Sequence, residues 1–172
     1  THIEGKIHEA IGQAAIAPTT HYMDLQETSE LDRTLLVERR LISRELANSQ
    51  GQRSVVFEPD ESISIMINEE DHLRLQVFCS GFDIRQTWQS ASEIDNRLEQ
   101  HLDYSFHPKY GYLTACPTNV GTGMRVSIML HLPGLVLSDE IGKVFSAVTK
   151  VNLAVRGLHG EGTQASGHFY QV

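Results

Sequence analysis

The feature that most constrains the fold is an alternation of apolar residues between positions 53 and 79. In the stretch RSVVFEPDESISIMI, every second residue is apolar at Val55 and Phe57 and again at Ile63, Ile65 and Ile67. A Pro-Asp-Glu-Ser segment separates these two runs, which is typical of a tight turn between strands. The stretch HLRLQVFC continues the alternation. Because strands joined by short connections pair antiparallel, we predict a sheet of neighbouring antiparallel strands.

Segments with helical spacing flank these strands. Apolar residues at near-helical spacing predict an amphipathic helix over residues 31 to 47, interrupted or bent near residues 42 and 43. A second helix with one buried stripe is predicted over residues 84 to 102, and a third from Ser138, a plausible N-cap, to Val151. YGYLTAC, MRVSIMLHLP, LAVRGLHG and GHFYQV read as further strands, of which the second is expected to be central and to end at Pro133.

This order of elements predicts an α+β fold with an antiparallel-dominated sheet packed with helices. With 172 residues, 40% hydrophobic and 21% charged, the chain is expected to form a single domain around one core. A doubly wound fold is not favoured, since no G-x-G-x-x-G follows a first strand and no G-x-x-x-x-G-K-[ST] occurs.

The charge balance limits what the surface can bind. The chain has 22 acidic and 14 basic residues and a formal net charge of -8 at pH 7, which argues against a nucleic-acid or membrane surface. No apolar run suits a membrane span or a signal peptide, so we expect a cytoplasmic protein. Two separated cysteines and dispersed histidines predict neither a disulfide framework nor a metal site made of clustered side chains.

Three polar clusters stand where strands are expected to end. NEEDHLR, residues 68 to 74, places Arg74 three residues after three consecutive acids. CPTNVGTG, residues 116 to 123, has glycines that can expose backbone N–H groups to an anion, and Arg125 follows it. RGLHGEGT, residues 156 to 163, displays Arg156 and Glu161 among glycines. Taken alone, NEEDHLR reads rather as a solvated turn, and the other two read equally as a tight turn and a hairpin.

Together, the three clusters favour phosphoryl transfer. Arg74, Arg125 and Arg156 offer guanidinium forks that suit phosphate oxygens. Glu70 and Glu161 offer carboxylates that suit a cationic group. A site with both signs of charge is what transfer of a phosphoryl group from a nucleotide to a basic nucleophile requires.

In this order and spacing, NEEDHLR, CPTNVGTGMR and RGLHGEGT resemble the ATP:guanido phosphotransferase family, which includes creatine and arginine kinases. CPTNVGTG is similar to the family signature around its reactive cysteine. LLVERRLIS, ISIMINEEDHLRLQ, GYLTACPTNVGTGMR and IMLHLPGLVL most resemble the bacterial protein-arginine kinases, which phosphorylate arginine side chains of other proteins. The resemblance covers the chain from about residue 22 to residue 172.

The resemblance implies a site as well as an activity, with ATP and magnesium as cofactors and proteins with exposed arginines as substrates. Glu70 and Glu161 would bind the substrate guanidinium, Cys116 would lie beside it, and Glu69 would act on magnesium through water. The nucleotide-binding residues that it implies are Arg40, Arg74, Arg125, Val126, Ser127, Ile128, Met129, Arg156, Gly157, Leu158, His159 and Gly160.

Some features depart from the family pattern. Nothing in residues 1 to 30 resembles the S-S-R-x-R strand of the family, and the family continues beyond Val172. We therefore expect one partial catalytic domain over residues 1 to 172, truncated at both ends. Arg40 stands where the family usually has a histidine.

Two alternatives remain: a kinase of a small free guanidino compound, and a non-catalytic module that binds a nucleotide or arginine. A homodimer is also left open.

Overall fold

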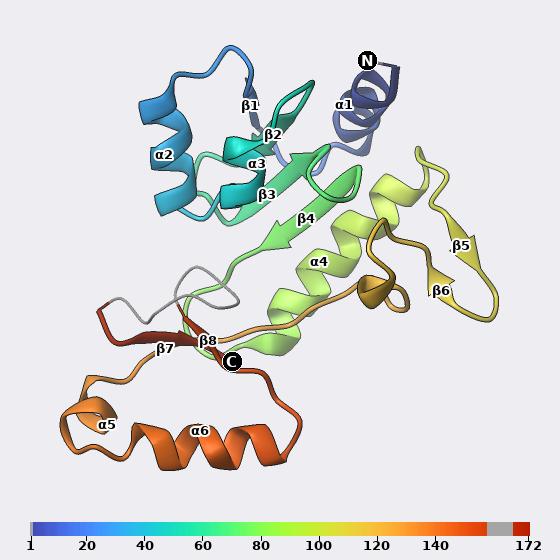
Figure 1. The fold of residues 1–172 in the computed structure, drawn as a ribbon. Coiled ribbons are helices and arrows are strands. Elements are labelled where there is room, and N and C mark those ends of the chain that lie inside the picture. The colour runs from blue at the N-terminus through green and yellow to red at the C-terminus, as the bar shows by residue number, and fades with distance from the viewer. Residues whose placement is uncertain (1, 158–166) are drawn as a thin grey trace. The chain divides into compact units, whose positions relative to one another are not determined.

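The computed structural model describes residues 2–157 and 167–172 (Figure 1). The chain divides into two compact units, Thr1–Met124 and Arg125–Val172. Within the described residues, no helix is both long and apolar enough to cross a membrane.

The first unit is built on a four-stranded antiparallel sheet with the strands in sequence order. Its strands are β1 (His21–Asp24), β2 (Ser54–Phe57), β3 (Ile63–Ile67) and β4 (Leu73–Val77). Val56 faces Ile65 across β2 and β3, and Ile65 faces Leu75 across β3 and β4. The three strands predicted from the alternation are thus confirmed, because β-branched residues at every second position suit a half-buried pleated surface. β1 was not predicted.

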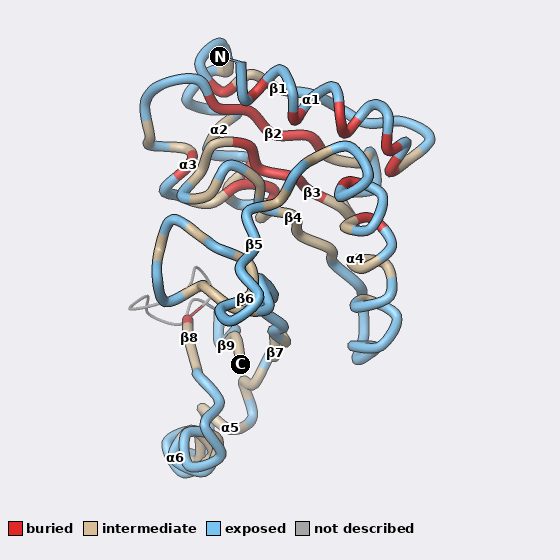
Figure 2. The backbone as a smooth tube through the Cα atoms, turned by 90° about the vertical axis from the view of Figure 1, so that its right-hand side faces the viewer, coloured by how far each residue is buried: buried red, intermediate tan, exposed pale blue. Residues whose placement is uncertain are grey.

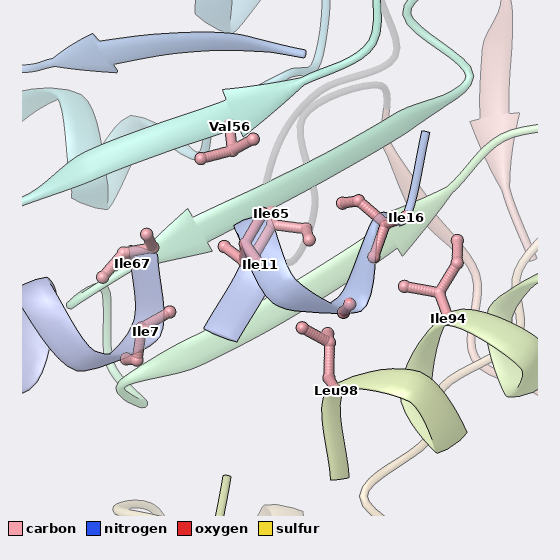
Figure 3. Packing of buried hydrophobic residues seen from close by; sticks show 9 residues of the cluster. Ile7, Ile11, Ile16, Val56, Ile65, Ile67, Ile94 and Leu98 are labelled. Atoms are coloured by element: carbon pink, nitrogen blue, oxygen red, sulfur yellow. The ribbon is translucent and has the colours of Figure 1, made fainter. Parts of the chain in front are cut away.

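One face of this sheet packs against two helices, α1 (His2–Ala14) and α4 (Ile84–Glu99). Figure 3 shows the side chains of β2 and β3 meeting those of the helices. The buried members of this cluster are Ile7, Ile11, Ala14, Ile16, Val56, Ile65, Ile67, Ile94 and Leu98. The buried segments, red in Figure 2, gather in α1, β2 and β3. Burial of each large aliphatic side chain contributes about 1.5–3 kcal/mol, so this cluster supplies much of the stability of the unit.

The opposite face packs against the helices α2 (Glu30–Glu38) and α3 (Arg44–Asn48). Its buried residues are Leu25, Leu36, Leu41, Ile42, Leu46, Val55 and Met66. Because β2 and β3 carry apolar residues on both faces, they are the best covered strands of the sheet.

The helix predicted over residues 31 to 47 is divided into α2 and α3, as its expected interruption indicated. Ser29 and Ser43 begin the two helices, since their side chains accept hydrogen bonds from the backbone N–H of Asp32 and Leu46 at 3.1 and 3.0 Å. The predicted apolar stripe was wrong at Leu31, which is 78% exposed. Within α2 only Leu36 is buried, and Ile42 and Leu46 reach the core after the break.

The last part of the first unit is a short hairpin followed by a loop. Its strands, β5 (Phe106–His107) and β6 (Gly111–Tyr112), pair antiparallel, and the 3-10 helix η1 (Pro117–Asn119) lies within the loop. The strand predicted in YGYLTAC is therefore limited to its first residues. Tyr112, the last residue of β6, also pairs its backbone with Gly121, with N to O distances of 2.8 and 3.2 Å.

The second unit contains a three-stranded antiparallel sheet and two helices. In the sheet, β9 (Phe169–Gln171) lies between β7 (Met129–His131) and β8 (Arg156–Gly157), and the helices are α5 (Pro133–Leu137) and α6 (Ile141–Lys150). The prediction that residues 124 to 133 form a central strand was wrong, because β7 is short and has one strand neighbour among the described residues. Pro133 is the first residue of α5, a position whose N–H has no partner within a helix, so the missing N–H of proline costs no hydrogen bond.

The N-cap predicted at Ser138 was also wrong. Ser138 is the residue that ends α5, where its N–H bonds to the Gly134 carbonyl at 3.0 Å. α6 then begins after Glu140 without a side-chain cap. The Phe145 ring of α6 packs edge-on against Tyr170 of β9, with 4.8 Å between centroids.

Candidate active site

The acidic residues of NEED lie at the tip of the tight connection between β3 and β4. Asn68 adopts a left-handed conformation (φ 59°), which asparagine tolerates better than most residues. Its side-chain oxygen lies 3.0 Å from His72 Nδ1, and its Nδ2 donates to the Gln52 carbonyl at 3.0 Å. Asn68 thereby fixes the turn that presents Glu69, Glu70 and Asp71.

Glu69 and Arg74 form an ion pair at the base of this turn. Glu69 Oε1 lies 2.9 Å from Arg74 Nη1, and Oε2 accepts the N–H of Glu70 at 3.1 Å. Burial alone raises the pKa of the Glu69 carboxyl. However, a hydrogen bond from Ser43, the Glu70 N–H and the charge of Arg74 together hold that pKa below its usual value. Glu69 is therefore ionised near neutral pH.

The other two acids of the turn reach the loop of Cys116. Asn119 Nδ2 donates to Glu70 Oε2 at 3.2 Å, and the backbone N–H of Ala115 donates to Asp71 Oδ1 at 2.7 Å. These bonds join segments that are 49 and 44 residues apart in the chain. The structure thus brings two of the three predicted clusters together, both within the first unit.

The loop of Cys116 has an internal structure of its own. Cys116 Sγ lies 2.9 Å from Thr118 Oγ1, and Thr114 Oγ1 donates to the Cys116 carbonyl at 2.7 Å. Gly121 does not offer its N–H to an anion as expected, since its backbone pairs with that of Tyr112. Thr118 holds the thiol in place next to the start of η1.

A small pocket of about 180 Å³ adjoins the acidic turn. Its lining residues are Glu45, Leu46, Ser49, Glu69 and Glu70. Three of these five residues are glutamates, but the surface that lines the pocket is mostly apolar. Glu45, at the start of α3, was not among the predicted site residues.

Arg40 lies in the turn that follows α2, also in the first unit. It has a left-handed conformation (φ 64°), and its carbonyl accepts a hydrogen bond from Gln76 Nε2 at 3.3 Å. This bond ties the turn to β4, two residues from Arg74. The expected contact of Arg40 with a nucleotide stays a prediction.

The remaining predicted residues belong to the second unit or lie outside the described residues. Arg125, Val126, Ser127 and Ile128 precede β7, and Met129 begins it. Two backbone bonds join Ile128 to Val172 at 2.8 and 3.0 Å, and Ser127 Oγ accepts from Gln171 Nε2 at 2.7 Å. Arg156 and Gly157 form β8. Leu158, His159, Gly160 and Glu161 lie outside the described residues, so the meeting of Glu70 with Glu161 stays a prediction.

The described residues offer little for direct metal binding. Among residues 2–157 and 167–172, no three histidine, cysteine, aspartate or glutamate side chains gather in a way that could hold a metal ion. Both oxygens of Glu69 already accept protein hydrogen bonds. The expected role of Glu69 toward magnesium through water stays a prediction.

Asp71 and Asn119 were missed as site residues, although both lie within the recognised motifs. Their contacts depend on two loops meeting in space, which spacing along the chain does not reveal. A signal was nevertheless present, because both side chains can form hydrogen bonds. Asp71 directly follows Glu70, and Asn119 lies in the loop of Cys116.

The sequence model of the family described as ATP:guanido phosphotransferase, C-terminal catalytic domain, matches residues 2–172. The chain therefore belongs to the ATP:guanido phosphotransferase family, which confirms the resemblance predicted from its motifs.

The curated relatives specify the family branch. The protein-arginine kinase of Moorella thermoacetica is 49% identical over 166 residues, which are 96% of this chain and 46% of that protein. That of Symbiobacterium thermophilum is 50% identical over 148 residues, 86% of this chain and 42% of that protein. The chain thus spans less than half the length of these relatives.

Solved structures confirm the predicted fold. The duplicated taurocyamine kinase of Schistosoma mansoni with bound transition state analog components matches with a TM-score of 0.78 and 25% identity, over 98% of this chain and 25% of that chain. Lombricine kinase matches with a TM-score of 0.75 and 22% identity, over 99% of this chain and 50% of that chain. At such identities the likeness supports the α+β fold.

Proposed function

We propose that the chain is the catalytic part of a kinase that transfers the γ-phosphoryl group of ATP to arginine side chains of proteins. The observation that carries this proposal is the identity of 49% to a protein-arginine kinase over 96% of the chain. The contact between the turn of Glu70 and the loop of Cys116 supports it, because Asn119 of that loop donates to the carboxylate of Glu70.

The chemistry explains why such residues are needed. A guanidinium has a pKa above about 12 and a delocalised lone pair, so it is a poor nucleophile. In this proposal Glu70 accepts N–H groups of the guanidinium, orients one nitrogen toward the γ-phosphorus and favours its deprotonation as the new bond forms. Glu161 would be the second carboxylate. The new N–P bond replaces the bond from the γ-phosphorus to the leaving oxygen of ADP.

The charge of the nucleotide requires cationic partners. Arg74 would bind phosphate oxygens from β4, and Arg125 and Arg156 would do so from the second unit. Bound magnesium supplies further neutralisation of the phosphate charge. Catalysis by these residues would rest on positioning and electrostatics. Cys116 would lie beside the guanidinium as a polarising group and not as a covalent nucleophile.

The test is detection of acid-labile phosphoarginine by mass spectrometry after incubation with ATP, magnesium and an arginine-rich unfolded protein. We expect Glu70→Gln to lower the rate by about 10²-fold or more, since it removes the proposed guanidinium partner. Glu93→Gln, which neutralises an exposed acid on α4, is the matched control and should match the unsubstituted protein. Equal activity of Glu70→Gln and Glu93→Gln would exclude the proposed role of Glu70.

The same assay separates the alternatives. The likeness to a structure named as a taurocyamine kinase favours a kinase of a small guanidino compound. Such a kinase would phosphorylate free arginine or taurocyamine and leave protein arginine unmodified. A non-catalytic module would bind ATP without turnover. The higher identity to proteins named protein-arginine kinase favours the protein substrate.

We also propose that the protein acts in the cytoplasm of a bacterium, as the bacterial organisms of its relatives suggest. A homodimer is part of the proposal, and light scattering coupled to size-exclusion chromatography would measure it. No interaction with nucleic acid or membranes is proposed, given the net charge of -8.

A further inference from the structure

Two hydrogen bonds clamp the acidic turn to the loop of Cys116. The Ala115 N–H bonds to Asp71 Oδ1 at 2.7 Å, and Asn119 Nδ2 bonds to Glu70 Oε2 at 3.2 Å. They hold the loop at two places, directly before Cys116 and three residues after it. Neither bond is needed to close the turn itself, because Asn68 and His72 already do so through backbone and side-chain contacts.

The two bonds act on different parts of the site. Asp71 accepts from a backbone donor, so its carboxylate fixes the path of the main chain at the residue next to the cysteine. A charged acceptor makes this bond stronger than a neutral pair. Asn119 orients the carboxylate of Glu70 and engages Oε2; in the described part of the chain no protein donor is seen on Oε1. That oxygen is left to meet a cationic substrate.

We propose that Asp71 and Asn119 are positioning residues that set the spacing and orientation of Glu70 and Cys116 before substrate binds. This inference rests on the proposed function for its catalytic consequence, but the clamp itself is testable without any activity. The substrate class it serves is a planar guanidinium, which needs an acceptor oxygen held in a fixed direction for in-line transfer.

The first test measures the reaction of each cysteine with iodoacetamide in the full chain, peptide by peptide, by mass spectrometry. Asp71→Ala should raise the rate at Cys116 by about threefold or more, because release of the Ala115 N–H lets the loop open. Cys79 is the exposed internal reference and should keep its rate.

Two variants separate the clamp from a change in charge. Asp71→Asn is also neutral but retains an oxygen that can accept from Ala115, so Cys116 should react at nearly the original rate. Asp103→Ala removes an exposed charge elsewhere in the same unit and should have no effect. Equal rates at Cys116 in Asp71→Ala and the unsubstituted chain would overturn the proposal, as would an equal rise in Asp71→Asn.

The second test uses phosphorylation kinetics. Asn119→Ala should lower kcat for an arginine-rich protein by about tenfold while the KM for ATP is unchanged, because Glu70 loses its orientation. Asn119→Asp places a second carboxylate next to Glu70, which favours protonation of one of the two, so the acid limb of the pH–rate profile should move to higher pH. A merely structural role would leave that limb in place.

The two tests fail separately. If the unsubstituted protein phosphorylates no guanidinium, the proposed function is wrong and the cysteine rates alone decide whether the clamp exists. If phosphorylation is normal and Asn119→Ala and Asn119→Asp leave kcat and the pH profile unchanged, the positioning role is wrong while the proposed function stands.

Discussion

Arg74 Nη1 lies 2.9 Å from Glu69 Oε1 in an ion pair whose acid is buried and whose base faces outward. The Glu69 side chain is 7% exposed, whereas that of Arg74 is 43% exposed. The carboxylate therefore holds the guanidinium from the protein side and leaves its other N–H groups available to a ligand. For the proposed kinase, Glu69 acts as the residue that orients a phosphate-binding arginine.

Arg74→Lys should weaken ATP binding more than it weakens the fold. Lysine keeps the charge but loses the planar fork that contacts both Glu69 and phosphate oxygens. We expect the KM for ATP to rise by roughly tenfold, with a smaller change in the unfolding midpoint. Steady-state kinetics and urea unfolding measure the two effects. Arg85→Lys, at an exposed position of α4, is the control, and an equal rise in that variant would contradict the assignment.

Glu69 should make stability depend on pH in the acidic range. Because its pKa is lowered in the folded state, its contribution is present above the unfolded pKa and is lost as pH falls through the folded pKa. Glu69→Gln should reduce the free energy of unfolding by about 1–2 kcal/mol at pH 7, and this difference should shrink toward pH 3. Urea unfolding at several pH values measures it. A difference that stays constant from pH 7 to pH 3 would exclude the ionised carboxylate as its cause.

Much of the first unit could be predicted from local patterns, but α1 was missed. Ile7, Ile11 and Ala14 recur at helical spacing and are all buried, so the signal was present in the sequence. Glycines at positions 5 and 12 weaken that signal, since glycine has low helix propensity. The packing of α1 on the sheet offsets its weak helix propensity, and a local propensity contains no information about that packing.

The sites show the same limit more strongly. NEED and CPTN were predicted as polar clusters at the ends of strands, but their meeting was not predicted, since the bond from Asn119 to Glu70 spans 49 positions of the chain. Register and loop geometry determine such a contact. The strand that contains Met129 shows a different error. Its run of apolar residues was interpreted as a central strand, but β7 lies at the edge of a three-stranded sheet.

Leu98→Ala should be strongly destabilising. Leu98 lies on α4, is fully buried and packs in the cluster of Ile65 and Ile94. Truncation removes apolar contacts and leaves a cavity, for which we expect a loss of about 2–5 kcal/mol in the free energy of unfolding. The matched control is Leu31→Ala on α2, whose exposed side chain should contribute within about 0.5 kcal/mol. Urea unfolding followed by circular dichroism compares them, and similar losses would contradict the assigned core.

Gly111→Ala should disturb the loop of Cys116 through a steric clash. A Cβ atom at Gly111 would lie 2.2 Å from the carbonyl oxygen of Gly121, the residue whose backbone pairs with Tyr112. Gly111 also has a φ of 82°, which an L side chain rarely adopts. Gly51→Ala is a matched control, because Gly51 has a φ of 96° but no atom within 4 Å of an added Cβ.

Both variants therefore carry backbone strain, and Gly111→Ala alone adds the overlap with Gly121. We expect Gly51→Ala to cost about 1 kcal/mol and Gly111→Ala to cost at least about 2 kcal/mol more, because a main-chain oxygen cannot move without breaking its pairing. Amide hydrogen exchange should locate the damage: protection at Tyr112 and Gly121 falls in Gly111→Ala and is retained in Gly51→Ala. Retained protection at both residues in Gly111→Ala would show that the close approach of these two backbones is not required.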